Sequence, residues 1–238
     1  MVLDPAKTVR EVAVAFPQAP RVFEKTKIDY CCRGDQLLGD ACAKAGVDLL
    51  VLEQMLEANA ATTVSGLDCG QLSVAQLIKY ILDTHHVYTR DEMQRLEGLV
   101  ESTVHAHGAN HPELLSMRNL LQQLFAELKG HMFKEERILF PFVIQLEESR
   151  SQHRPAPFAP FGTVYNPVRM MIVEHDNAGD LLRELRKLSR GYRVPDDACA
   201  SYQEFYKALE AFEQDLHQHI HLENNILFPK AIALEGDL

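Results

Sequence analysis

The sequence predicts an all-α protein, in which an antiparallel up-down-up-down four-helix bundle follows a small N-terminal helical domain. Apolar residues recur at helical spacing in four long segments, and modest loops join these segments in order, which favours antiparallel neighbours. No stretch of useful length alternates between apolar and polar residues as a half-buried strand does. The first 58 residues show shorter helical patterns, broken by proline and glycine, that are stable only when packed.

The N-terminal domain, residues 1–58, is expected to hold four short helices. Thr8 and Glu11 have the spacing of a capping box and begin the first helix, which ends near Pro17. Residues 59–71 are small, polar and β-branched and include two glycines, so they predict a linker. The other three helices of this domain are expected over residues 21–27, 35–44 and 48–57.

The four-helix bundle is expected to occupy residues 72–238. Ser73 and Gln76 form a second capping box at its start, and Gly191 marks the end of its third helix. A proline-rich loop separates the second helix from the third. The four helices are predicted over residues 73–105, 113–148, 163–190 and 195–233.

Composition narrows the class of protein and of partner. The net charge is −10 and basic residues form no long cluster, so neither nucleic acid nor anionic membrane is expected as the partner. No apolar run approaches the ~18 residues that span a bilayer, and the first residues lack a signal-peptide pattern, so we expect a cytoplasmic protein. Five cysteines, two of them adjacent, do not suggest a disulfide framework. Apolar residues in the N-terminal domain would suit a homodimer contact, although the oligomeric state is left open.

One pattern occurs twice, in the second and fourth bundle helices. A histidine and a glutamate stand four residues apart, and Ile-Leu-Phe-Pro begins seven residues after the histidine in both copies. The preceding helix adds one histidine to each copy, at a separation of 45 residues in the first and 44 in the second. The residues concerned are His86, His131, Glu135, His175, His219 and Glu223.

This spacing predicts a metal site inside the bundle. Positions four apart lie on one stripe of a helix, and apolar neighbours such as Met132, Ile138 and Ile220 predict that the stripe is buried. Buried carboxylates without partners are very unfavourable, and a metal bound by neutral imidazole and ionised carboxylate removes that difficulty. Four histidines and two glutamates suit two iron ions with bridging carboxylates and an oxo or hydroxo bridge, leaving room for a small ligand. Zinc is the alternative, but structural zinc sites are usually single and rich in sulfur.

Neighbouring histidines are predicted to lie outside the site. His85 and His86 point about 100° apart, so only one is expected to face the interior, and the apolar positions Leu82 and Met93 favour His86. His217 and His221 are two residues from the fourth-helix histidine, and we expect them at the surface or beside the ligands.

The adjacent cysteines Cys31 and Cys32 have several interpretations. A disulfide between neighbours is strained and easily reduced. The pair could instead take part in redox chemistry, be nitrosylated, or pass iron as thiolates, which the nearby Lys27 and Arg33 would favour. The alternative is that both are small residues packed in a short helix.

The doubled histidine–glutamate pattern resembles the hemerythrin-like (HHE) family. The segment Asp29-Tyr30-Cys31-Cys32, like the segments at 131–136 and 222–229, is similar to the repair-of-iron-centres di-iron proteins of that family. The resemblance implies a non-haem di-iron centre held by the six residues given above. It also implies that Glu174 and Glu127 line a proton or ligand route. Oxygen carriers of the family have a further histidine and an aspartate ligand that this chain lacks, and Arg33-Gly34-Asp35 replaces the usual glycine pair and basic residue.

The function implied by the resemblance is repair or protection of iron–sulfur clusters under nitrosative or oxidative stress. Nitric oxide, or another diatomic molecule or peroxide, would bind at the irons, and reduction of nitric oxide to nitrous oxide would make the protein an enzyme. Damaged iron–sulfur proteins would then be partners. The alternatives are a non-catalytic sensor or scavenger of nitric oxide or oxygen, and an iron donor.

Overall fold

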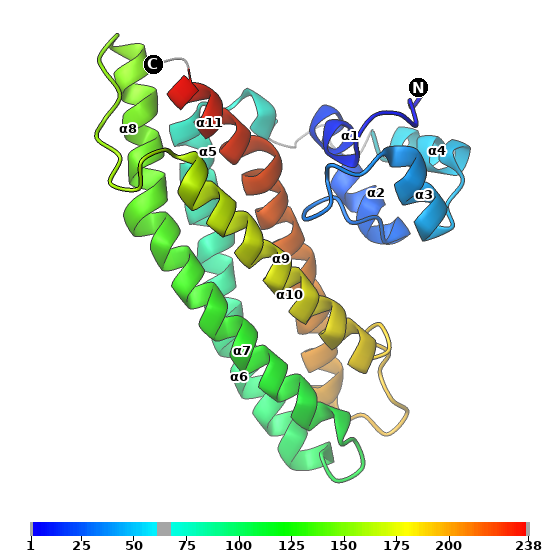
Figure 1. The fold of residues 1–238 in the computed structure, drawn as a ribbon. Helices are drawn as coiled ribbons and strands as arrows, with labels where there is room; N and C mark the ends of the chain where they lie inside the picture. The colour runs from blue at the N-terminus through cyan, green and yellow to red at the C-terminus, as the bar shows by residue number, and fades with distance from the viewer. Residues whose placement is uncertain (1, 61–67, 237–238) are drawn as a thin grey trace.

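The computed structural model describes residues 2–60 and 68–236, and within them helices joined by loops make up the fold (Figure 1). The nearest approach to a strand in this part of the chain is an isolated antiparallel bridge between Thr8 and Leu37. The predicted all-α class is therefore confirmed. Among the described helices, none combines the length and the apolar character that crossing a bilayer requires.

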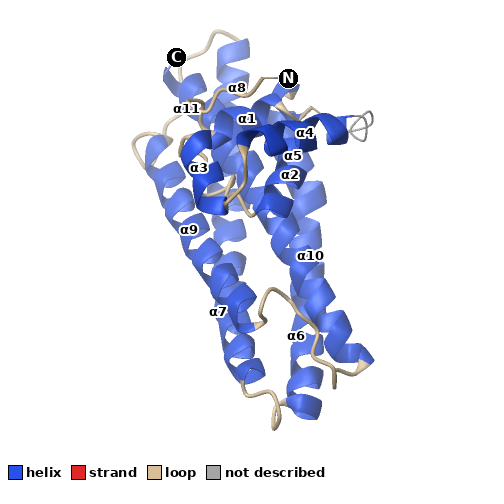
Figure 2. Ribbon diagram, turned by 90° about the vertical axis from the view of Figure 1, so that its right-hand side faces the viewer, coloured by secondary structure: helices blue, strands red, loops and turns tan. Residues whose placement is uncertain are grey.

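Four helical rods form the bundle, and they alternate in direction in both ribbon views (Figures 1 and 2). Along the contacts between rods, α6 packs on α7 and on α10, and α7 packs on α9. The predicted up-down-up-down order is confirmed. The rods are α5 (Val74–Ile81), η3 (Leu82–His86) and α6 (Val87–His107); α7 (Glu113–Lys134), η4 (Glu135–Leu139) and α8 (Phe140–Ser151); α9 (Tyr165–Leu188); and α10 (Ala200–Leu222), η5 (Glu223–Leu227) and α11 (Phe228–Gly236).

Three of the four rods contain one turn of π-helix, namely η3, η4 and η5. In η4 the backbone N–H of Phe140 bonds to the carbonyl of Glu135, five residues back, and Phe228 does the same to Glu223 in η5. A proline follows η4 and η5, at the second residue of α8 and of α11. Proline donates no backbone hydrogen bond and crowds the preceding turn, so a wider turn at this point relieves the conflict.

The bundle interior consists of two apolar clusters with a polar layer between them. One cluster fills the half that contains α6 and α7, with Leu96 and Phe212 among its fully buried members. The other fills the half that contains α5, α8 and α11, with Leu146 and Phe228 among its members. The six residues of the doubled pattern lie along the rods between these clusters.

The N-terminal domain has its own small core and lies against one side of the bundle (Figure 1). Its first helix begins with the predicted capping box, in which Thr8 and Glu11 bond to each other's backbone N–H. The loop between its second and third helices reaches the bundle, where Cys31 packs among the residues of the first bundle cluster. Its helices are α1 (Val9–Ala15), α2 (Ala19–Thr26), α3 (Leu38–Ala45) and α4 (Leu49–Ala60).

The structure describes only part of the linker predicted over residues 59–71. Helix α4 extends to Ala60, and a short 3₁₀ turn, η2 (Cys69–Gln71), precedes the bundle. Residues 61–67, the centre of the predicted linker, lie outside the described residues. At the start of the bundle, Ser73 and Gln76 make the predicted capping box.

Candidate metal centre

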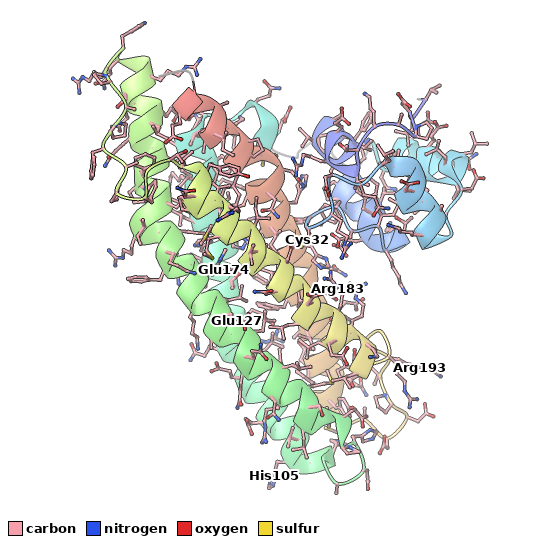
Figure 3. All side chains as sticks on the ribbon, viewed as in Figure 1. Cys32, His105, Glu127, Glu174, Arg183 and Arg193 are labelled. Atoms are coloured by element: carbon pink, nitrogen blue, oxygen red, sulfur yellow. The ribbon has the colours of Figure 1, made fainter. Side chains whose placement is uncertain are left out.

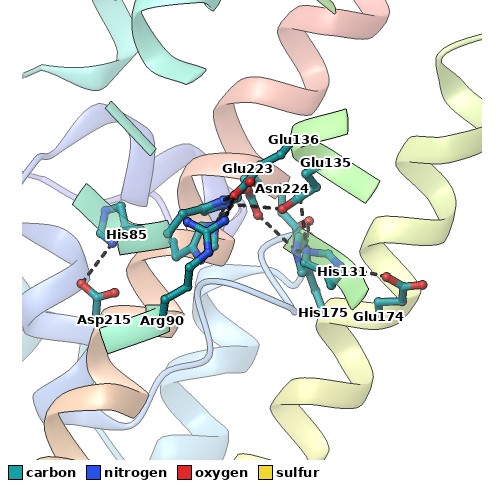
Figure 4. A network of polar contacts seen from close by, with 12 residues as sticks. His85, Arg90, His131, Glu135, Glu136, Glu174, His175, Asp215, Glu223 and Asn224 are labelled. Atoms are coloured by element: carbon teal, nitrogen blue, oxygen red, sulfur yellow. Dashed lines mark hydrogen bonds and ion pairs between the residues drawn. The ribbon is translucent and has the colours of Figure 1, made fainter. Parts of the chain in front are cut away.

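Six ionisable side chains meet in the polar layer at the middle of the bundle (Figure 4). They come from all four rods: from η3, from α7 with η4, from α9, and from α10 with η5. Each is buried, with exposed fractions from 0% to 4%. The residues brought together are His86, His131, Glu135, His175, His219 and Glu223.

These side chains form two groups that share both glutamates. The first group contains His86 and His219, whose Nε2 atoms lie 3.1 Å apart. The second contains His131 and His175, whose Nε2 atoms lie 2.9 Å apart. In each group the candidate ligand atoms, including one oxygen from each glutamate, lie within 4.8 Å of one another. The arrangement therefore has the form of two adjacent cation sites.

The carboxylates face the imidazoles in a bridging arrangement. Glu135 places Oε1 3.3 Å from the Nε2 of His131 and Oε2 3.5 Å from that of His86. Glu223 places Oε1 3.0 Å from the Nε2 of His219 and Oε2 3.1 Å from that of His175. Ligands about 2.1 Å from an ion and roughly 90–110° apart are separated by about 3.0–3.4 Å. The spacing thus fits an ion within each group.

The hydrogen-bond partners of the carboxylates support the same interpretation. Both oxygens of Glu135 and Oε2 of Glu223 are buried and accept no hydrogen bond from the described part of the chain. A buried carboxylate normally has partners, because an unsatisfied charged oxygen is strongly unfavourable. Two imidazoles and two carboxylate oxygens are a donor set that iron, zinc and other divalent ions accept. The residues present therefore fit a pair of metal ions.

The outer ring nitrogens of three histidines are held by further polar groups, which leaves Nε2 free to face the interior. Such contacts fix the tautomer and the ring orientation of a metal-binding histidine. The pairs are His86 Nδ1 with Glu136 at 2.7 Å, His131 Nδ1 with Glu174 at 2.9 Å, and His175 Nδ1 with Asn224 at 2.8 Å. For His219, Nδ1 is buried and has no hydrogen-bond partner among the described residues.

Two cations balance the charges of the outer carboxylates. Arg90 contacts Glu136, and Lys134 contacts Glu174. The hydrogen bond with His131 lowers the pKa of Glu174 to about 2, with Lys134 assisting and partial burial opposing. This carboxylate is therefore ionised at neutral pH and able to accept a hydrogen bond from the imidazole.

Without an ion, protons neutralise the pocket. Burial opposes the charged form of His86, but the close carboxylates of Glu135 and Glu223 attract its charge and raise its pKa to about 10. For His131, burial is likewise outweighed by the attraction of the two glutamates and a hydrogen bond with Glu174, and its pKa rises to about 10. Burial lowers the pKa of His219. In the metal-free pocket, the positive charges of two imidazolium ions thus balance the negative charges of two carboxylates.

The two acidic residues predicted for a proton route have different positions (Figure 3). Glu174 lies beside the site, bonded to the ring of His131, with a quarter of its side chain exposed. Glu127 is exposed on α7 and accepts a hydrogen bond from Gln123. The position of Glu127 does not support the prediction, because this residue lies on the solvent-facing side of α7 and its side chain points away from the interior.

Two expectations about neighbouring residues, on His85 and Ile138, were wrong, and for His221 the surface alternative is excluded. His85 is as buried as His86, because its Nδ1 bonds to Asp215 of α10 at 3.0 Å and its ring stacks on that of His219. His221 is buried, because the N-terminal domain covers it and Tyr30 packs against its ring. Ile138, expected in the core, has 47% of its surface exposed, since the π-turn of η4 carries it outward.

The cysteine pair lies between the N-terminal domain and α9. The Sγ atoms of Cys31 and Cys32 are 3.6 Å apart as free thiols, and the Sγ of Cys32 is 3.7 Å from the backbone carbonyl of His175. Together with Asp29 they form a third group that could hold a metal ion. Contact with Cys32, followed by burial and the charge of Asp29, raises the pKa of Cys31 well above its ordinary value. The expected thiolate stabilisation by nearby basic residues therefore does not hold for Cys31.

Sequence reasoning missed Glu136, Asn224 and Asn225. Glu136 comes directly after Glu135, and Asn224 and Asn225 are the next two residues after Glu223. This adjacency to the predicted ligands is the signal that the sequence offers for their role. A regular helix turns by about 100° per residue, so adjacency alone predicts that these side chains point away from the site. In the structure they lie in the π-turns η4 and η5, where Glu136 and Asn224 contact histidines of the polar layer and Asn225 contacts His221.

Comparison with known proteins agrees with this geometry. Residues 77–231 match the family model described as Hemerythrin HHE cation binding domain, and residues 5–60 match one described as a domain of unknown function, DUF542. A protein of Pectobacterium carotovorum subsp. carotovorum is 34% identical over 231 residues, which cover 96% of this chain and 98% of the relative. A protein of Yersinia pseudotuberculosis is 32% identical over 224 residues, which cover 94% and 96%. Both relatives are named iron–sulfur cluster repair protein YtfE. The chain therefore belongs to the hemerythrin HHE family, in the group that includes these repair proteins.

Proposed function

We propose that this protein binds two iron ions in the polar layer and repairs or protects iron–sulfur clusters in the cytoplasm under nitrosative or oxidative stress. The observation that carries the proposal is the pair of four-residue groups that share Glu135 and Glu223, three of whose four buried oxygens have no hydrogen-bond partner among the described residues. The names of the relatives supply the cluster-repair part of the proposal.

When bound, the two irons would supply coordination positions for a small ligand and two reducing equivalents. The chain itself supplies a buried pocket, four imidazoles, three of which are fixed by outer hydrogen bonds, and two bridging carboxylates. Glu174 touches His131 and is partly exposed, so we assign it the transfer of protons between the site and solvent. We infer that nitric oxide is the small ligand, and that its reduction to nitrous oxide accompanies binding.

Metal content is the first test. The protein, prepared without oxygen and loaded with ferrous iron, is expected to hold two irons per chain and to develop oxo-bridge absorption bands in air. Glu135→Leu and Glu223→Leu remove one bridging group each, so each should lose at least one iron. Glu127→Leu is the matched control, because that glutamate is exposed on the same rod. Two irons in both bridging variants would remove these glutamates from the ligand set.

Nitric oxide titration then separates the functions. An enzyme given an added reductant should produce nitrous oxide well beyond one equivalent per site, whereas a sensor or scavenger should saturate and keep its iron. Cluster repair is measured by incubating the loaded protein with an iron–sulfur enzyme inactivated by nitric oxide and following the recovery of activity. Recovery equal to that given by free ferrous iron would contradict a repair role.

Iron donation is a second candidate, favoured by the third metal-binding group. Asp29, Cys31 and Cys32 lie beside the backbone of His175, where they could receive an ion that leaves the bundle. Under this proposal, replacing both cysteines with serine slows iron transfer to an apo-ferredoxin while the iron content stays at two. An unchanged rate of transfer would count against it.

A further inference from the structure

The N-terminal domain touches the bundle at the same π-turn that carries a glutamate of the metal centre. Segment η5 holds Glu223, Asn224 and Asn225, which are all buried. Asn224 lies between the two parts of the protein, because its Oδ1 accepts from His175 Nδ1 at 2.8 Å while its Nδ2 donates to the carbonyl of Cys31 at 3.0 Å. One amide therefore joins a histidine of the site to the cysteine loop.

Asn225 makes a second connection. Its Nδ2 donates to the carbonyl of Tyr30 at 2.8 Å, and its Oδ1 accepts from Nε of Arg10 at 2.8 Å. The same Nδ2 is 2.8 Å from Nδ1 of His221, which lies beneath the N-terminal domain. The asparagine is 6% exposed. These contacts are therefore shielded from water while the domain is docked, and undocking exchanges each of them for hydrogen bonds with water.

The fit between the two parts is tight on both sides of these asparagines. A Cβ added to Gly34 would lie 2.9 Å from Oδ1 of Asn225 and 3.3 Å from the carbonyl of Tyr30. A Cβ added to Gly179 of α9 would lie 3.3 Å from the Sγ of Cys32. Close packing of this kind leaves little freedom for the cysteine loop to shift while the asparagine contacts remain.

We propose that Asn224 and Asn225 are positioning residues that couple the metal centre to docking of the N-terminal domain, so that the docked domain slows metal release and metal loss loosens the domain. The proposal rests on the metal-binding function proposed above. It assigns to the N-terminal domain an effect on the metal that does not require its cysteines to bind iron.

The direction of the coupling follows from the hydrogen bonds of Asn224. The amide can accept from His175 and donate to Cys31 in only one orientation, so docking holds the acceptor toward the imidazole. This keeps the proton of His175 on Nδ1 and the lone pair of Nε2 toward the pocket. A cation on Nε2 makes the Nδ1–H a stronger donor and so strengthens the contact in return. Such coupling is reciprocal, so metal binding stabilises docking by the same factor.

The test changes docking at two residues of the N-terminal domain, neither of which is a proposed metal ligand. Arg10→Ala removes the donor to Asn225, and Gly34→Ala inserts a methyl group beside the same asparagine. Lys7→Ala is the matched control, because Lys7 is an exposed cation of the same domain. Each variant is prepared as the full chain and loaded with ferrous iron. Two quantities are then measured: the rate of iron release to a colorimetric ferrous chelator, and amide hydrogen exchange of the peptide spanning residues 28–36.

The expected result is iron release about 3- to 10-fold faster in Arg10→Ala and Gly34→Ala than in the wild type, the effect of losing one typical buried hydrogen bond. Lys7→Ala should release iron at the wild-type rate. In the wild type, removal of iron should speed hydrogen exchange over residues 28–36, and both docking variants should show fast exchange even when loaded.

Two results would overturn the coupling. One is unchanged iron release in the docking variants although residues 28–36 exchange faster, which would show that the domain loosens without effect on the metal. The other is identical exchange of residues 28–36 in loaded and metal-free wild type. A wild-type chain that binds no iron in the initial loading would instead refute the proposed function, and the coupling with it.

Discussion

Metal binding should release about two protons per chain at pH 8. In the metal-free pocket the pKa values of His86 and His131 are raised to about 10, so both imidazoles are almost fully protonated at that pH. Both Nε2 atoms must lose their protons before they can bind a cation. Because both pKa values lie above the working range, the logarithm of the apparent metal affinity should rise by about two for each pH unit between pH 7 and pH 9.

Anaerobic titration calorimetry measures this proton release directly. Metal-free protein is titrated with ferrous iron at pH 8 in two buffers of different ionisation enthalpy, and the difference in heat gives the number of protons. The Glu127→Leu variant should give the wild-type number, because that side chain is exposed on the surface of α7. Release of fewer than one proton, or an affinity that does not change between pH 7 and pH 9, would refute the assignment of charge in the pocket.

Three further predictions concern stability. The raised pKa values of His86 and His131 stabilise the metal-free protein fully below pH ~6.5, and this contribution is lost as the pH rises toward 10. The melting temperature of the metal-free protein should therefore fall from pH 7 to pH 10, and a flat or rising profile would contradict this. Glu213→Leu leaves the Arg186 guanidinium without its buried partner and should lower the free energy of unfolding by about 3 kcal/mol in urea titration, whereas a change under 1 kcal/mol would show that the pair is dispensable. Thr8→Ala removes the capping box with Glu11 and should lower that free energy by about 1 kcal/mol, a loss that Thr8→Ser should largely restore.

The helices and four of the six residues of the site follow from local rules that act within one helix, whereas His86 and His175 follow from the repeat of the whole pattern. Spacing of four residues places His131 with Glu135, and His219 with Glu223, whatever the helices pack against. Thr8 and Ser73 begin helices because their side chains bond to nearby backbone N–H groups. Information of this kind is contained in short stretches of sequence.

The remaining features depend on contacts between distant parts of the chain. Only one of His85 and His86 was expected to face the interior, because a regular helix turns them about 100° apart. His85 is nevertheless buried, because it lies in the π-turn η3 and bonds to Asp215 of another rod. His221 is buried only because the N-terminal domain covers it. Asn224 acts as a bridge only once Cys31 and His175, far apart in sequence, are brought together. Without the docked arrangement, no spacing rule predicts these contacts.

The polar layer between two apolar clusters has a consequence for the empty protein. Each end of the bundle is stabilised by its own buried apolar cluster, which needs no ion. The polar layer between them, in contrast, needs positive charge to balance two buried carboxylates. Protonated imidazoles can supply this charge when the metal ions are absent, so the fold should remain intact at neutral pH after the metal is lost. We therefore expect this protein to lose and regain its metal ions without unfolding in between.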